Sequence, residues 1–233
     1  ESASTGVKNS EIQKPEDLEG KKVGVQINTT AHESANEFLE TIKFELKPYD
    51  QIIMPFTDLK AGRLDAIIVD EVVAQYYVNL EPQSYKVAGA RLTNEPIGIC
   101  FKKENTAMRD KVDDLIIEMR KDGALKAISE EWFGEDLTTN VDGAVTEVTN
   151  KGSFPSDKKV LKVGVDDVYP PMEFKDEKNN TVGIDVDLAK EIGKRLGMEV
   201  EIVSTAWDGI FTSLNTDKFD CIIVGGGLAG STA

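Results

Sequence analysis

Polar residues follow several predicted strands of the chain, and their types could bind a small zwitterion. Thr29 and Thr30 stand where a predicted helix begins, so hydroxyl groups, N–H groups and the helix dipole could hold a carboxylate there. Asp70 follows a predicted buried strand and offers a fixed negative charge for an ammonium group. Together these residues predict a site for a molecule that carries both charges.

A second set of such residues lies in the C-terminal part of the chain. Asp166 could accept from a polar or cationic group, while Tyr169 and Trp207 offer flat faces for an aliphatic or cationic part. Gly225 and Gly226 would let a ligand approach the backbone closely. Most of these residues follow the carboxyl ends of predicted strands, where open α/β sheets bind their ligands. We expect no metal and no cofactor.

Each of these residues also has an ordinary structural role that the sequence leaves open. Thr29, Thr30 and Asp70 could each cap a helix. Asp166 could be a solvated turn residue, and Trp207 could pack on a sheet in the core. The sequence alone does not decide between these roles and ligand binding.

The chain is poor in the residues that most enzyme and metal sites use. Its single histidine, His32, excludes histidine-rich metal sites and leaves one candidate for a Ser-His-Asp triad. The two cysteines, Cys100 and Cys221, lie in apolar runs, which predicts buried strand thiols; a disulfide would require that their strands are neighbours. Residues 225–230 match G-x-G-x-x-G only loosely, so we expect no dinucleotide site.

Composition excludes further classes of partner. The 233 residues include 42 acidic and 27 basic side chains, and the resulting net charge of −15 disfavours nucleic acid. No apolar run is long enough to span a bilayer, and the polar residues 1–6 carry no targeting signal. Hydrophobic residues make up 40% of the chain, which supports one large domain or two small lobes.

An internal repeat favours two related lobes. The sequence Lys-Val-Gly-Val occurs at residues 22–25 and again at 162–165. Downstream of each copy, residues 56–70 and 211–225 share seven identities in fifteen positions. Strands and helices alternate in both copies, which predicts mostly parallel sheets flanked by helices. The expected fold class is therefore α/β.

The predicted elements run in the same order in both copies. In the first copy we predict strands at 23–25, 52–54 and 66–69, with helices at 31–46 and 58–62. In the second copy, we predict strands at 161–165, 198–203 and 221–224, with helices at 184–196 and 207–215. Between the copies, a helix pair is predicted at 110–121 and 123–133, followed by a polar linker at 137–156.

Several short motifs stand out in the two copies. The second copy carries VGVDDVYPPMEF (163–174), VGIDVDL (182–188) and WDGIF (207–211). The first copy and the helices after it carry LEGKKVGVQ (18–26), NTT (28–30), GRLDA (62–66) and WFG (132–134). These motifs resemble those of the type II periplasmic (extracytoplasmic) solute-binding proteins of ABC transporters, in the branch that binds polar amino acids. These matches cover most of the chain and imply the two-lobe fold of that family.

The resemblance also implies roles for the candidate residues. Asp70 would hold the α-ammonium group of an amino acid, and Thr29 and Thr30 its α-carboxylate. Tyr169 and Trp207 would contact its side chain, and Asp166 would face the side-chain or amino end. The two lobes would close around the ligand by a hinge motion, without catalysis. The two carboxylates suit a cationic or amide side chain, such as that of Arg, Lys or Gln, better than an acidic one.

The family motifs occur in circularly permuted order. This order implies a leader or linker at 1–13, lobe 2 at 14–92, a strand and helices packing on lobe 1 at 97–136, a linker at 137–159, and an incomplete lobe 1 at 160–233. The arginine with which the family clamps the α-carboxylate has no counterpart, so we expect weak binding unless a complementing segment or a swapped protomer supplies it. An engineered permutation, a fragment of a tandem array and a sequence with a piece left out remain open.

By the same resemblance, the partners are an amino-acid ligand and the permease of an ABC transporter, at an extracytoplasmic location. Two alternatives remain. One is a dehydratase-like enzyme for small acids, although the sequence shows no paired acid and base. The other is a ligand-sensing domain of a signalling protein or an engineered biosensor.

Overall fold

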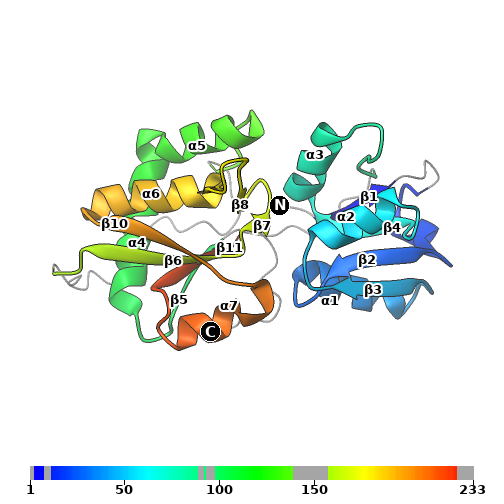
Figure 1. Cartoon of the computed structure of the whole chain (residues 1–233), viewed down its shortest axis with the longest axis horizontal. Coiled ribbons are helices and arrows are strands. Elements are labelled where there is room, and N and C mark those ends of the chain that lie inside the picture. Colours follow the sequence, from blue (N-terminus) through cyan, green and yellow to red (C-terminus); the bar gives the residue numbers. More distant parts are fainter. Residues whose placement is uncertain (1–2, 8–11, 89–91, 93–97, 139–156, 225–233) are drawn as a thin grey trace. The chain divides into compact units, whose positions relative to one another are not determined.

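The computed structural model describes residues 3–7, 12–88, 92, 98–138 and 157–224. The chain divides into two compact units. The first unit comprises Glu1–Ile97, Val168–Pro170 and Gly226–Thr232, and the second comprises Gly98–Asp167, Pro171–Gly225 and Ala233. Each unit has its own mixed sheet with helices packed on it (Figure 1).

The sheet of the first unit has the strand order β1-β4-β2-β3. The strands β2 (Lys22–Gln26), β3 (Glu45–Tyr49) and β4 (Ala66–Asp70) are parallel, and β1 (Ala3–Val7) pairs antiparallel with β4. A short 3-10 helix, η1 (Pro15–Leu18), precedes β2. The helices that connect or follow the parallel strands are α1 (Thr30–Leu39), α2 (Ile53–Lys60) and α3 (Glu71–Leu80).

The sheet of the second unit repeats this plan, with the strand order β10-β6-β11-β5. The strands β6 (Val160–Val165), β10 (Glu199–Ser204) and β11 (Cys221–Val224) are parallel, and β5 (Gly98–Phe101) pairs antiparallel with β11. The helices are α4 (Thr106–Asp122), α5 (Ala124–Phe133), α6 (Ile184–Leu196) and α7 (Trp207–Asn215). A hairpin of β8 (Glu173–Lys175) and β9 (Thr181–Val182) leads into α6.

Central strands are buried on both faces. In the first unit, the neighbouring residues Ile67 and Ile68 of β4 contribute to two different apolar clusters, one containing Phe56 and the other Val23 and Val25. Successive side chains of a strand point to opposite faces, so each cluster occupies one face of the sheet.

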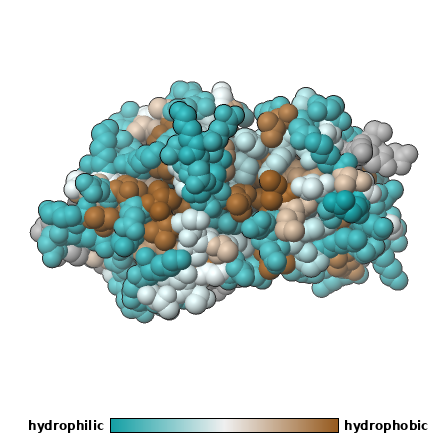
Figure 2. All heavy atoms as spheres, in the orientation of Figure 1, coloured by the Kyte–Doolittle hydropathy of each residue, from teal (hydrophilic) through white to brown (hydrophobic). Residues whose placement is uncertain are grey.

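The face of the molecule seen in Figure 2 is mostly hydrophilic. The predicted α/β class is confirmed.

Two predicted elements of the first copy are wrong. Residues 52–54, predicted as a strand, instead begin α2, and the helix predicted at 31–46 ends at Leu39. The strand between them is β3, which lies at the edge of the sheet. Its Pro48 lacks an N–H group, which an edge strand tolerates. Because β3 also contains polar residues, it is not recognised as an apolar run. The apolar run at 52–54 does not mark a buried strand, because Ile53 and Met54 are 46% and 47% exposed on α2.

Candidate functional site

The turn between β2 and α1 places Thr29 and Thr30 at a helix start, as predicted. Thr29 is the N-cap: its Oγ1 accepts from the N–H of His32 at 3.2 Å and donates to the carbonyl of Gln26 at 2.9 Å. The Nδ1 atom of His32 in turn accepts from the N–H of Asn28 at 3.4 Å. Both the Thr29 hydroxyl and the imidazole therefore have structural roles in this turn.

Thr30 is placed differently. Its Oγ1 atom is shielded from solvent and has no hydrogen-bond partner among the described residues. Such a hydroxyl loses its hydration without compensation, which is unfavourable unless a further group satisfies it. Of the two threonines, Thr30 is thus the one whose hydroxyl is not already used by the helix cap.

Asp70 ends β4 and immediately precedes α3. The residue is 8% exposed, although charged side chains are seldom buried without a specific reason. It holds the N-cap position of α3, but its carboxylate makes no capping hydrogen bond to that helix. The hydroxyl of Tyr169, in the short strand β7 (Val168–Tyr169), donates a hydrogen bond to Oδ2 of Asp70. Helix capping therefore does not explain this buried carboxylate.

In the second unit, Asp166 and Asp167 directly follow β6 and are 7% and 9% exposed. The carboxylate of Asp167 accepts from Ser204 Oγ at 2.8 Å and lies 2.8 Å from Nζ of Lys175. These contacts tie the loop to β10 and β8. Asp167 is thus a structural residue of the loop, and both aspartates are too buried to be ordinary solvated turn residues.

Trp207 is the first residue of α7. It is partly buried, and its ring packs edge-to-face on Phe211 with centroids 5.6 Å apart and an interplanar angle of 75°. One face of α7 is anchored in the core by Ile210 and Leu214. Gly225 and Gly226, the remaining predicted site residues, lie outside the described residues.

Two buried acidic residues beside this loop are not among the site residues predicted from the sequence. Glu173 and Asp185 are 5% and 2% exposed, and their carboxyl groups lie close enough to interact directly. Burial, reinforced by the negative charge of Asp185, raises the pKa of Glu173 well above its ordinary value. The two residues are twelve positions apart on different elements, so spacing alone gives no signal of their contact.

The two cysteines lie on neighbouring strands but do not form a disulfide. Cys100 of β5 is paired with Ile222, and Cys221 of β11 is paired with Phe101. The thiols therefore occupy adjacent positions of the ladder and point to opposite faces of the sheet. Burial raises the pKa of both thiols, which makes them poor nucleophiles. Cys221 is buried as predicted, whereas Cys100 is only partly buried.

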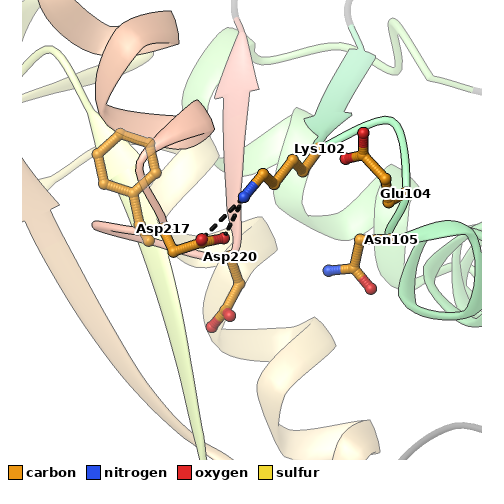
Figure 3. A pocket seen from close by; sticks show the side chains of 6 residues that line it. Lys102, Glu104, Asn105, Asp217 and Asp220 are labelled. Atoms are coloured by element: carbon orange, nitrogen blue, oxygen red, sulfur yellow. Dashed lines mark hydrogen bonds and ion pairs between the residues drawn. The ribbon is translucent and has the colours of Figure 1, made fainter.

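A separate pocket of about 540 Å³ lies in the second unit (Figure 3). Its lining includes Lys102, which follows β5, and Asp217 and Asp220, which precede β11. The Lys102 ammonium contacts both carboxylate oxygens of Asp217 at 2.8 Å. Because this pocket is at the amino end of β11, it is on the opposite edge of the sheet from Asp166 and is not part of the predicted site.

Other kinds of site find no support in the described part of the chain. It contains no group of three or more His, Cys, Asp or Glu side chains placed to hold a metal ion. None of the helices described is both long enough and apolar enough to cross a membrane.

Comparison with known proteins identifies the family. The family model for bacterial extracellular solute-binding proteins, family 3, matches residues 14–135 and 161–226. The chain belongs to this family. As the sequence resemblance implied, it has the type II periplasmic-binding fold of amino-acid-binding proteins. The permuted order of its motifs remains a prediction.

Individual members of the family are similar over part of their length. The L-cystine-binding protein TcyJ of Escherichia coli (strain K12) is 36% identical over 127 residues, which cover 54% of this chain and 47% of the relative. The histidine-binding periplasmic protein of the same strain is 33% identical over 138 residues, covering 56% and 53%. The chain thus spans about half the length of these curated relatives.

The fold comparison gives the same result. The structure of an ancestral arginine-binding protein bound to arginine has 36% sequence identity and a TM-score of 0.54, and the match covers 57% of this chain and 62% of that one. All three of these proteins bind amino acids, according to their names.

Proposed function

We propose that this chain binds a polar or cationic amino acid and does not convert it chemically. The observation that carries the proposal is the carboxylate of Asp70, which is buried at the carboxyl end of β4 and does not cap the helix that follows. A buried carboxylate of this kind suits an ammonium group, because a charge-assisted hydrogen bond offsets the cost of its desolvation.

The other candidate residues complete the proposed site. The helix start at Thr30 would hold the α-carboxylate, Tyr169 and Trp207 would contact the ligand side chain, and Asp166 would face its polar end. Of the glycines, Gly225 and Gly226 would approach the ligand through their backbone. Since both Asp70 and Asp166 are acidic, we favour arginine, lysine, histidine or glutamine over aspartate and glutamate.

We further propose that the chain acts outside the cytoplasm and delivers its ligand to the permease of an ABC transporter. The names of the family and of its periplasmic members support this location. We also retain the prediction that an arginine from a complementing segment or a second protomer strengthens binding of the α-carboxylate.

The proposal is tested by titrating the chain with single L-amino acids while recording backbone amide chemical shifts, which detects even millimolar affinities. We expect saturable shifts with arginine or another cationic or amide ligand, and at least a tenfold loss of affinity in Asp70→Asn. The exposed Glu37→Gln in α1 is the charge-matched control and should bind as the parent does. Absence of binding by every amino acid, or turnover of the ligand, contradicts the proposal.

A further inference from the structure

The pair of buried acids next to Asp166 connects three segments of the second unit. Glu173 lies on β8, and Asp185 lies in the first turn of α6. Their carboxyl groups lie close enough to interact directly, and the Glu173 carboxyl group also accepts the backbone N–H of Asp166. The atoms Oε2 of Glu173 and Oδ2 of Asp185 are both shielded from solvent. The pair therefore joins the loop after β6 to β8 and to α6.

The backbone holds the two carboxyl groups together. The N–H of Asp185 donates to the carbonyl of Met172 at 3.1 Å, and the N–H of Ile184 donates to that of Pro171 at 3.2 Å. Gly183 adopts a φ of 136°, and a Cβ atom there would lie 2.1 Å from the carbonyl oxygen of Met172. Segment 171–173 is thus seated directly against the start of α6, and the two acids have little freedom to separate.

The charges around the pair do not neutralise it. The charged neighbours that act on Glu173 are Asp185 and Asp166, and both are acidic. Lys175, on the same strand, is paired with Asp167. Asp187, the other acid in the first turn of α6, accepts from Trp132 and Lys190. Two ionised carboxylates in contact and away from water would repel each other strongly, whereas one shared proton turns the contact into a hydrogen bond.

We propose that Glu173 and Asp185 share one proton at neutral pH and that the pair positions the backbone of Asp166 for ligand binding. Both acids are positioning residues, because they act through the loop that carries Asp166. The sharing of the proton requires no ligand, whereas the positioning of Asp166 rests on the proposed function.

The shared proton is tested by the pH dependence of unfolding. Both tryptophans of the chain, Trp132 and Trp207, belong to the second unit, so tryptophan fluorescence during urea unfolding reports on this unit. Consider a carboxyl group whose pKa is higher in the folded than in the unfolded protein. Its contribution to the stability of the folded state is complete below the unfolded pKa of about 4.3 and is lost as the pH rises towards the folded pKa. The unfolding constant of the parent should then carry a contribution that rises by up to about tenfold per pH unit above about pH 5, until the folded pair itself ionises.

Two isosteric variants isolate this contribution. In Glu173→Gln, the amide can donate to Asp185 and its oxygen can accept from Asp166, but no proton is exchanged. We expect this variant to lose the pH-dependent contribution, while Glu177→Gln, in the exposed turn after β8, should retain the slope of the parent. Equal slopes in all three proteins overturn the shared proton.

The positioning of Asp166 is tested by ligand titration of the same variants with arginine. We expect Glu173→Ala to weaken binding at least tenfold, and Glu173→Gln to restore it at pH 7. If Glu173→Ala fails to fold, Asp185→Ala takes its place, with Asp185→Asn as the conservative rescue. A folded glutamine variant that does not restore binding overturns the positioning role. Failure of the parent to bind any amino acid overturns that role together with the proposed function, while the unfolding slopes still decide whether the proton is shared.

Discussion

Lys162 and Asp220 exchange two hydrogen bonds: the N–H of Lys162 donates to Oδ2 of Asp220 at 2.8 Å, and the N–H of Asp220 donates to the carbonyl of Lys162 at 2.8 Å. Lys22 and Asp65 of the first unit make the same two bonds at the same distances. In each unit the aspartate immediately precedes a central parallel strand. The sequence repeat therefore encodes a repeated connection that fixes the start of one strand beside its neighbour.

The glycine of each Lys-Val-Gly-Val copy is required because a side chain packs closely on it. A Cβ atom at Gly24 would lie 2.5 Å from Cδ1 of Leu64, and one at Gly164 would lie 2.5 Å from the ring of Phe219. Each apolar side chain thus packs directly on the bare backbone of the strand. Sequence comparison within the chain finds the repeated glycine, but only the structure shows that a different side chain fills the space in each unit.

Replacing Asp220 should destabilise the second unit by about 2 kcal/mol. The variant Asp220→Ala loses the bond from the Lys162 N–H and the part-buried ion pair with Lys158 at 2.6 Å. Asp217→Asn is the control, because its ion pair with Lys102 leaves 76% of the Asp217 side chain exposed and should contribute less than about 1 kcal/mol. Urea unfolding followed by tryptophan fluorescence measures both, and equal effects would show that the Lys162–Asp220 connection is not important for stability.

Gly183 should be far less tolerant of a side chain than Gly197. Both residues have positive φ, 136° and 68°, but a Cβ atom at Gly183 would collide with the backbone of Met172, whereas one at Gly197 meets nothing within 4 Å. We expect Gly183→Ala to cost several kcal/mol, up to about 4, and Gly197→Ala about 1 kcal/mol. Comparable unfolding midpoints for the two variants would contradict this close approach of α6 to the segment before β8.

Trp132 should stabilise the second unit partly through its indole N–H. The Nε1 atom donates to Asp187 of α6 at 3.0 Å, and the ring packs edge-to-face on Phe174 with centroids 6.0 Å apart. Trp132→Phe keeps most of the ring packing and should cost about 1 kcal/mol, whereas Trp132→Ala should cost about 3 kcal/mol. The fluorescence of Trp207 reports unfolding in both variants. Equal losses would assign the whole effect to the indole N–H, whereas no loss in Trp132→Phe would assign it to packing.

Tyr49 should ionise only at a higher pH in the folded protein than in the unfolded chain. Its hydroxyl donates to Asp58 at 2.7 Å, and partial burial together with that carboxylate raises its pKa to about 12. Because the folded pKa exceeds the unfolded value of about 10, the contribution of this phenol to stability is complete below about pH 10 and is lost as the pH rises towards 12. Carbon-13 NMR of labelled tyrosine, with Tyr49→Phe for assignment, measures this; titration near pH 10 would show that the bond does not persist in solution.

Much of the fold was predictable because the repeat and the apolar runs mark the central strands. The strand β11 and the helix α7 have the predicted bounds, and α6 does as well. Edge elements were less predictable: β3 is polar and contains Pro48, and β1 carries the small and polar sequence Ala-Ser-Thr-Gly-Val. Such strands are specified by pairing with a neighbour, which local sequence does not reveal.

The candidate site, too, could be predicted only in part from the sequence. The positions of Thr29, Asp70 and Asp166 at strand ends follow from the order of strands and helices. Which hydroxyl caps α1 and which stays available depends on the geometry of one turn, so Thr29 and Thr30 look equivalent in the sequence. The contact between Glu173 and Asp185 depends on the packing of a hairpin against a helix, which no spacing rule describes.

The pairing of β5 with β11 has a consequence for synthesis of the chain. The paired residues Phe101 and Cys221 are about 120 positions apart, whereas β2, β3 and β4 all lie between Lys22 and Asp70. As the chain leaves the ribosome, the parallel strands of the first unit can associate early, because the contacts are local. Strand β5 must wait until residue 224 has emerged before its partner strand is available. Vectorial folding therefore leaves the backbone of β5 unpaired for longer than that of the parallel strands of the first unit.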